Sequence, residues 1–133
     1  MPRPEVSPEE NIVRAIHSAH WDIQTGRGSS QIFKGENISV TRLKILDLPV
    51  LFIIFHRQLD TSPNGMIVGA GEINVGRLQE IGRNFENPTE LTVEEDILDD
   101  NAAHAEIPQK ISRGLSKRIV TNLIFHQDLD ADL

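Results

Sequence analysis

Two spacings of hydrophobic residues occur along this chain, one typical of helices and one typical of strands. Ser7-Pro8-Glu9-Glu10 matches a helix-capping box with proline at the first helical position, and apolar residues then recur at positions 12, 13 and 16. This pattern predicts a first helix over residues 8–20. In residues 91–97 apolar and polar positions alternate instead, which predicts a strand with one face in water.

Glycines and serines interrupt any periodicity in residues 21–35. They predict a loop there, with at most a short extended piece at residues 31–33. Residues with β-branched side chains are frequent over residues 38–46, but the apolar positions change phase within that segment. We therefore expect a strand with a bulge near residues 41–42.

Capping and turn signals organise the middle of the chain. Asp47, with a proline two residues later, predicts a capped helix over residues 50–59, although a buried strand also fits the apolar run at its start. The Ser-Pro-Asn-Gly sequence at residues 62–65 predicts a turn, and a glycine-containing strand is expected to follow over residues 66–73. The two glycines of this strand, in Val-Gly-Ala-Gly-Glu at residues 68–72, resemble a nucleotide loop only superficially. They favour a strand that packs close to another backbone.

Two further helices are expected in the second half of the chain. Asn74 predicts the start of a short helix that ends at Gly82. A last helix is expected to begin at Pro108, because apolar residues follow it four apart, at positions 111, 115, 119 and 123. Together these elements predict the α+β class, with a small mixed or antiparallel sheet and three to four helices in a single layer on one face of it.

Length and cysteine content restrict the class of protein. The 133 residues predict a single domain over residues 1–133, with frayed tails at 1–6 and 127–133. Because the chain contains no cysteine, disulfides, thiolate nucleophiles and cysteine-based metal sites are excluded. No apolar signal segment or membrane-spanning run is present in the sequence, so we expect a cytoplasmic protein that does not bind membranes.

The formal net charge of −7 makes nucleic acid an unlikely class of partner, because such binding depends on Lys and Arg contacts with phosphates. One basic cluster lies in the last predicted helix. It would serve an anionic partner or form the solvated face of that helix, and we favour the solvated face. The cluster consists of Lys110, Arg113, Lys117 and Arg118.

The five histidines of the chain are candidate metal ligands. His104-Ala105-Glu106 matches the H-x-E half of the zinc deaminase signature, in which the histidine binds metal and the glutamate shuttles protons. The cysteine half of that signature is missing, and no histidine pair has the i, i+4 spacing of a zincin helix, so we expect neither a metal site nor a cofactor. His17 and His20 either face a common ligand or lie on a helix surface, and we favour the surface.

A polar constellation is expected if the loop over residues 21–35 folds over the start of the last helix. Serine beside histidine would suit nucleophilic catalysis, and arginine beside serine would suit an anion pocket. The candidate catalytic residues are His104, Glu106 and Ser30, and the candidate ligand-binding residues are Arg27, Ser29, Ser30 and Asn101. In the alternative that we favour, the serine and asparagine side chains only satisfy backbone groups in turns.

Three segments of the chain carry a resemblance: Arg-Gly-Ser-Ser-Gln-Ile-Phe at residues 27–33, Ile-Ser-Val-Thr-Arg at residues 38–42, and residues 98–107. They resemble a small bacterial domain family whose members read R-x-S-S-x-x-F, then a strand containing S-V, then D-N-P-A-H-A-x-I before a terminal basic helix. This chain has Ala102 where the family has proline. The resemblance implies a bacterial single-domain protein and supplies no assigned activity.

These observations favour a non-catalytic accessory or protein-interaction domain, such as an immunity or toxin-neutralising partner, with acidic residues 90–100 as its contact face. The alternative is a small enzyme or ligand-binding protein that acts on a nucleotide or other phosphorylated molecule, which requires Arg27, Ser30 and His104 to converge. A third hypothesis is self-association through residues 51–55 or the last helix.

Overall fold

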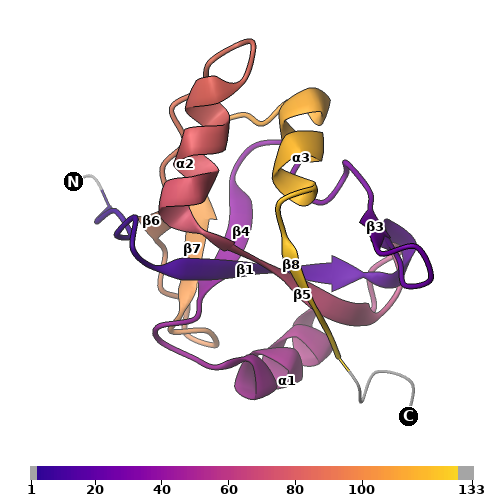
Figure 1. Ribbon diagram of the computed structural model, residues 1–133. Helices are drawn as coiled ribbons and strands as arrows, with labels where there is room; N and C mark the ends of the chain where they lie inside the picture. The colour runs from indigo at the N-terminus through magenta and orange to yellow at the C-terminus, as the bar shows by residue number, and fades with distance from the viewer. Residues whose placement is uncertain (1–2, 129–133) are drawn as a thin grey trace.

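In residues 3–128, the part of the chain that the computed structural model describes, six strands form one antiparallel sheet (Figure 1). Their order is β6-β7-β4-β1-β5-β8, and a separate pair, β2 and β3, forms a short ribbon in the loop after β1. The α+β class is confirmed, with more strand than expected. The strands are β1 (Asn11–His17), β2 (Trp21–Asp22), β3 (Arg27–Gly28), β4 (Ile38–Arg42), β5 (Ile67–Asn74), β6 (Glu94–Glu95), β7 (His104–Ile107) and β8 (Ile124–Gln127).

Helices cover both faces of this sheet (Figure 1). On one face α2 (Val75–Asn84) and α3 (Arg113–Val120) share a core with Ile12 of β1. On the other face α1 (Leu48–Leu59) shares a second core with Val13 of β1. The single layer of helices expected on one face is therefore wrong. The physical reason is that neighbouring residues of β1 are apolar, and neighbours on a strand point to opposite faces.

The helix expected over residues 8–20 is also wrong, because β1 and a 3-10 turn (Ser18–His20) occupy that segment. Ser7 begins a turn, in which its hydroxyl accepts a hydrogen bond of 3.2 Å from the backbone N–H of Glu9. The carboxylate of Glu10 does not complete a capping box and instead accepts two hydrogen bonds from Arg42, at 2.9 and 2.7 Å. Since β1 is buried on both faces, its apolar positions lose the period of 2 and match a helical spacing.

Several predictions from local signals are confirmed. Asp47 caps α1 by accepting a hydrogen bond of 3.3 Å from the backbone N–H of Val50. The turn at residues 62–65 and the strand β5 follow as expected. Asn74 caps α2, although this helix continues two residues beyond Gly82.

The glycines of β5 allow close contact with the neighbouring strand. A Cβ at Gly69 would lie 2.5 Å from the carbonyl oxygen of His126, and a Cβ at Gly71 would lie 2.7 Å from the side chain of Leu123. The strand packed close to another backbone, favoured for residues 68–72, is confirmed at Gly69.

The strand expected over residues 91–97 is wrong except at β6. Leu91 is buried as the alternation predicts, but Ile97 is 65% exposed. Backbone groups of this segment bond to irregular partners: the N–H of Thr92 donates to the side chain of Gln109, and the carbonyl of Val93 accepts from Val6. The segment therefore forms a regular ladder only where it meets β7.

Other boundaries also differ from the predictions. The last helix begins at Arg113, after the cap Ser112, and ends at Val120, so that residues 124–127 form β8 instead. The strand expected over residues 38–46 ends at Arg42 without the predicted bulge, and an irregularity in strand pairing lies in β1 instead, between Ile16 and His17. In the loop over residues 21–35, the extended pieces are β2 and β3 rather than residues 31–33.

Both described ends of the chain are attached to the sheet. Val6 is 3% exposed and donates a backbone hydrogen bond of 2.7 Å to Val93, and the backbone N–H of Asp128 donates one of 2.9 Å to Val68. Residues 1–2 and 129–133 of the expected tails lie outside the described residues. None of the helices between residues 3 and 128 is long and apolar enough to span a membrane.

Candidate functional site

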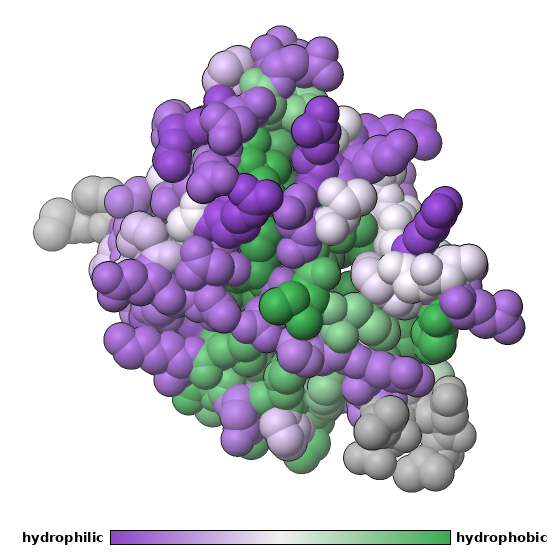
Figure 2. Space-filling view, in the orientation of Figure 1, coloured by the Kyte–Doolittle hydropathy of each residue, from purple (hydrophilic) through white to green (hydrophobic). Residues whose placement is uncertain are grey.

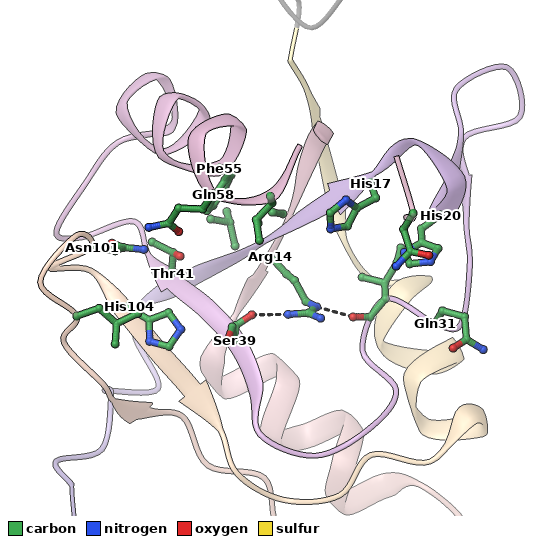
Figure 3. Close-up of a pocket in the computed structure, with 16 residues that line it drawn as sticks. Arg14, His17, His20, Gln31, Ser39, Thr41, Phe55, Gln58, Asn101 and His104 are labelled. Atoms are coloured by element: carbon green, nitrogen blue, oxygen red, sulfur yellow. Dashed lines mark hydrogen bonds between the residues drawn. The ribbon is translucent and has the colours of Figure 1, made fainter. Parts of the chain in front are cut away.

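A cavity of about 610 Å³ opens on the α1 face of the sheet (Figure 3). Helix α1 covers only part of this face, through Leu51 and Phe55, and polar side chains of β4 and β7 line the hollow beside it. We call this hollow the Arg14 cavity. Its lining comprises Val13, Arg14, Ala15, His17, His20, Gln31, Ile32, Ser39, Thr41, Phe55, Gln58, Leu59, Asn64, Leu98, Asn101 and His104.

Arg14 lies where two central strands separate. Strands β1 and β4 pair at Ile12 and Val13 and no further within the described chain. Beyond that point the Arg14 guanidinium lies between the strand and the loop, where Nη1 donates at 2.7 Å to the carbonyl of Ser39 and Nε donates to the carbonyl of Ile32 (Figure 3). In the described chain, Nη2 has no hydrogen-bond partner, so a cationic donor is available in the cavity.

Burial lowers the pKa of Arg14 to about 10, so the guanidinium is still a cation at neutral pH. The guanidinium carbon also lies 5.9 Å from the ring centroid of Phe33, close enough for a cation–π contact. Two carbonyls and one aromatic face thus hold the side chain in a defined position.

Three histidines line the same cavity. The Nδ1 of His17 lies 2.8 Å from the carbonyl of Gly65, and the Nδ1 of His104 lies 2.8 Å from the carbonyl of Asp96. Because a carbonyl only accepts, each Nδ1 carries the proton, and each Nε2 is left as an acceptor while the ring is neutral. The ring of His20 packs edge-on against His17, with centroids 6.1 Å apart. Burial, followed by the charges of His17 and Arg14, lowers the pKa of His20.

Thr41 and Asn101 contribute buried polar groups with unused hydrogen-bonding capacity. Thr41 is 3% exposed, and its hydroxyl has no hydrogen-bond partner among residues 3–128. Asn101 is 4% exposed; its Oδ1 accepts from the backbone N–H of Ala103 at 3.0 Å, whereas its Nδ2 has no partner in the same residues. Such groups usually find partners when they are buried, and here both line a cavity.

The charge of the cavity is opposite to the charge of the chain. The described residues that line it include one arginine and three histidines but no aspartate or glutamate, although the chain has a formal net charge of −7. A concave site with one sign of charge and apolar walls focuses the electric field and attracts ligands of the other sign. The lining therefore suits an anion.

The structure does not bring all the predicted site residues together. His104 and Asn101 line the Arg14 cavity, whereas Arg27 lines a second cavity of about 690 Å³ beside Trp21 and Phe125, and Ser30 lines a third beside Arg113. These three cavities of the described residues therefore do not bring Arg27, Ser30 and His104 together, as the enzyme hypothesis requires.

The remaining candidates have structural contacts. Ser29 accepts a hydrogen bond from the backbone N–H of Gln31 at 3.0 Å, and the Asn101 bond to Ala103 is of the same kind, so both side chains bond to turn backbone groups. Glu106 pairs with Arg3 at 3.2 Å. The four residues of the basic cluster at α3 are all exposed, which agrees with a solvated face.

Sequence reasoning missed Arg14 and Thr41 and favoured a surface role for His17 and His20. The signal available for Arg14 was its place within an apolar run. An arginine is rarely buried in a strand, so it indicates a functional position once the segment is known to be a strand. Among the described residues, no group of three or more histidines and carboxylates could hold a metal ion.

No family model, curated protein or solved structure matches this chain. The resemblance to a bacterial domain family stays a prediction, and the geometry of the Arg14 cavity is the basis for the functional argument.

Proposed function

We propose that this protein binds a small phosphorylated ligand in the Arg14 cavity. The observation that carries the proposal is the position of Arg14, a fixed guanidinium with an unpaired Nη2 in the described chain, in a cavity with histidines and without carboxylates in its described lining. This is the ligand-binding alternative from the sequence, with Arg14 in the place given to Arg27.

The chemistry of the lining favours phosphate over a neutral ligand. A guanidinium presents several donors in one plane and binds phosphate oxygens with charge-assisted hydrogen bonds, which are about twice as strong as neutral ones. The nearby His17 and His20 rings add further polar groups to the same cavity.

The protein-interaction hypothesis has less support from the contacts of its expected face. Within residues 90–100, Glu94 and Asp96 pair with Arg3 at 3.3 and 3.4 Å, and Glu95 pairs with Arg42 at 3.2 Å. Carboxylates that are already paired within the chain add less to a contact with a basic partner. Figure 2 shows apolar surface around α1, where Val50 and Ile53 are 42% and 61% exposed, so self-association stays a prediction.

Isothermal titration calorimetry with inorganic phosphate and ribose 5-phosphate tests the proposal. We expect Arg14→Gln to weaken binding by a factor of about 10 to 100, the worth of a hydrogen bond to a charged group. Arg27→Gln removes the same charge from a different cavity and should leave the affinity unchanged. Equal affinities of both variants and the unaltered protein would contradict the proposal.

A measurement on the unaltered protein covers the case in which Arg14→Gln does not fold. The chain has five histidines, of which His17, His20 and His104 line the cavity and His56 and His126 do not. In NMR spectra, addition of phosphate should shift the ring signals of the first three and leave the other two in place. Shifts confined to His56 and His126, or no shifts at all, would place the anion elsewhere.

A further inference from the structure

Three polar groups at one end of the Arg14 cavity have hydrogen-bonding capacity that the described chain does not use: the hydroxyl of Thr41, Nδ2 of Asn101 and Nε2 of His104 (Figure 3). We propose that they form a second subsite, which takes a neutral group that both donates and accepts hydrogen bonds. Resting on the proposed function, this makes the ligand an organic phosphate with hydroxyl or amide-like groups, such as a sugar phosphate or a nucleoside monophosphate.

Thr41 is the strongest indication of this subsite. Its side chain is 3% exposed, yet its hydroxyl has no partner within residues 3–128. Every polar side-chain atom of the described residues that is fully sealed from solvent has a partner, so this hydroxyl must still reach the cavity. A strand position this buried usually holds an apolar residue, and a hydroxyl there has a use if a ligand bonds to it.

Asn101 and His104 set the polarity of the subsite. The Oδ1 of Asn101 is engaged by Ala103, which orients the amide so that Nδ2 is the free donor. The Nδ1 of His104 donates to the carbonyl of Asp96, with an Asp96 carboxylate oxygen also 3.2 Å away, so Nε2 is the free acceptor of the neutral ring. The subsite therefore presents one donor, one acceptor and a hydroxyl that serves as either.

The register of the sheet joins the strands of Thr41 and His104 to the strand of Arg14. Thr41 is the direct cross-strand partner of both Val13 and His104, and Arg14 is the residue after Val13. Directly paired residues lie about 5 Å apart. The side chain of Arg14 begins on the opposite face of β1 from Val13 but lines the same cavity, because β1 and β4 no longer pair beyond Val13. One ligand in this cavity can therefore contact the guanidinium and the subsite. The cavity volume of about 610 Å³ is in the range of small-ligand sites.

The test is calorimetric titration with inorganic phosphate, ribose 5-phosphate and the four common nucleoside 5′-monophosphates. We expect at least one organic phosphate to bind about tenfold or more tightly than inorganic phosphate. Thr41→Val should lower the affinity for that ligand about three- to tenfold, as expected for the loss of one neutral hydrogen bond. The same substitution should leave the affinity for inorganic phosphate unchanged. Thr41→Ser retains the hydroxyl and should keep most of the affinity for the organic phosphate that Thr41→Val loses. Preference for ribose 5-phosphate or for one base identifies the group in the subsite.

The stability of Thr41→Val distinguishes a ligand-binding role of Thr41 from a purely structural one. Because the hydroxyl has no partner in the described chain, Thr41→Val should unfold at the same urea concentration as the unaltered protein or a higher one. A lower midpoint would assign Thr41 a structural role and overturn the proposal, as would unchanged selectivity in a folded Thr41→Val.

The binding results also distinguish the two proposals. If phosphate binding depends on Arg14 but no organic phosphate binds more tightly than inorganic phosphate, the second subsite is wrong and the proposed function stands. If no phosphate compound binds, the proposed function fails with it.

Discussion

The hydroxyl of Ser116 on α3 accepts a hydrogen bond of 3.1 Å from the backbone N–H of Phe33, which lies 83 positions earlier in the chain. The same hydroxyl donates at 2.6 Å to the carbonyl of Ser30. Ser116 is fully buried and thereby fixes the loop whose Ile32 carbonyl accepts from Arg14. A helix on the opposite face of the sheet thus helps to position the cation of the Arg14 cavity.

Ser116→Ala should therefore lower both stability and anion affinity. The substitution leaves the N–H of Phe33 and the carbonyl of Ser30 without their partner, and a loss of about 2 kcal/mol in the free energy of unfolding is expected in urea titrations. Ser30→Ala is the matched control, because Ser30 contributes its backbone carbonyl, which alanine retains. An unchanged Ser116→Ala variant would show that the loop is held by other contacts.

Stability should depend on the ionisation of His56, which joins α1 to the end of the sheet. Its Nδ1 lies 2.7 Å from Asp60, and its Nε2 contacts the carboxylate of Asp128. Burial lowers the pKa of His56, but the hydrogen bonds to Asp128 and Asp60 outweigh burial, and the pKa is raised above its ordinary value of 6.5. A raised pKa stabilises the fold at pH values below 6.5, and this contribution is lost as the pH rises through the folded pKa.

We predict that the urea midpoint falls as the pH rises above 6.5, and that His56→Gln makes this fall smaller. His20, whose pKa is lowered, changes charge mainly below that range and does not offset the effect. His126→Gln is the control. It removes a histidine that lies on the same side of the sheet as His56 and pairs with Glu72. A His56→Gln variant with the pH profile of the unaltered protein would contradict the assignment.

Gly28, between the candidate residues Arg27 and Ser29, should be needed for packing. A Cβ at this position would lie 2.6 Å from the ring of Trp21, which stacks on Phe125 with centroids 4.3 Å apart. Gly28→Ala is expected to cost about 1–3 kcal/mol and to shift the fluorescence of Trp21, the only tryptophan of the chain. Gly26→Asn is the control, because no atom lies within 4 Å of a Cβ there and asparagine tolerates the φ of +70°. Equal stability of Gly28→Ala and the unaltered protein would contradict this packing.

Predictions were most accurate where the signal acts over a few residues. The caps at Asp47 and Asn74 bind backbone groups three residues away, so their effect is contained in the local sequence. The prediction failed at β1, because burial on both faces removes the alternation that identifies a strand. It also failed over residues 91–97, where the partners of the backbone lie far away in sequence.

For the site, the sequence by itself was enough to single out Asn101 and His104 as polar residues at a turn and to exclude cysteine-based chemistry. Only the tertiary structure decided that they share a cavity with Arg14 and Thr41, and that Arg27 and Ser30 lie elsewhere. The physical reason is that capping, turns and composition act within a few residues, whereas a cavity depends on strand register and on the part of the sheet that a helix leaves uncovered. Both are determined by contacts between residues far apart in the chain.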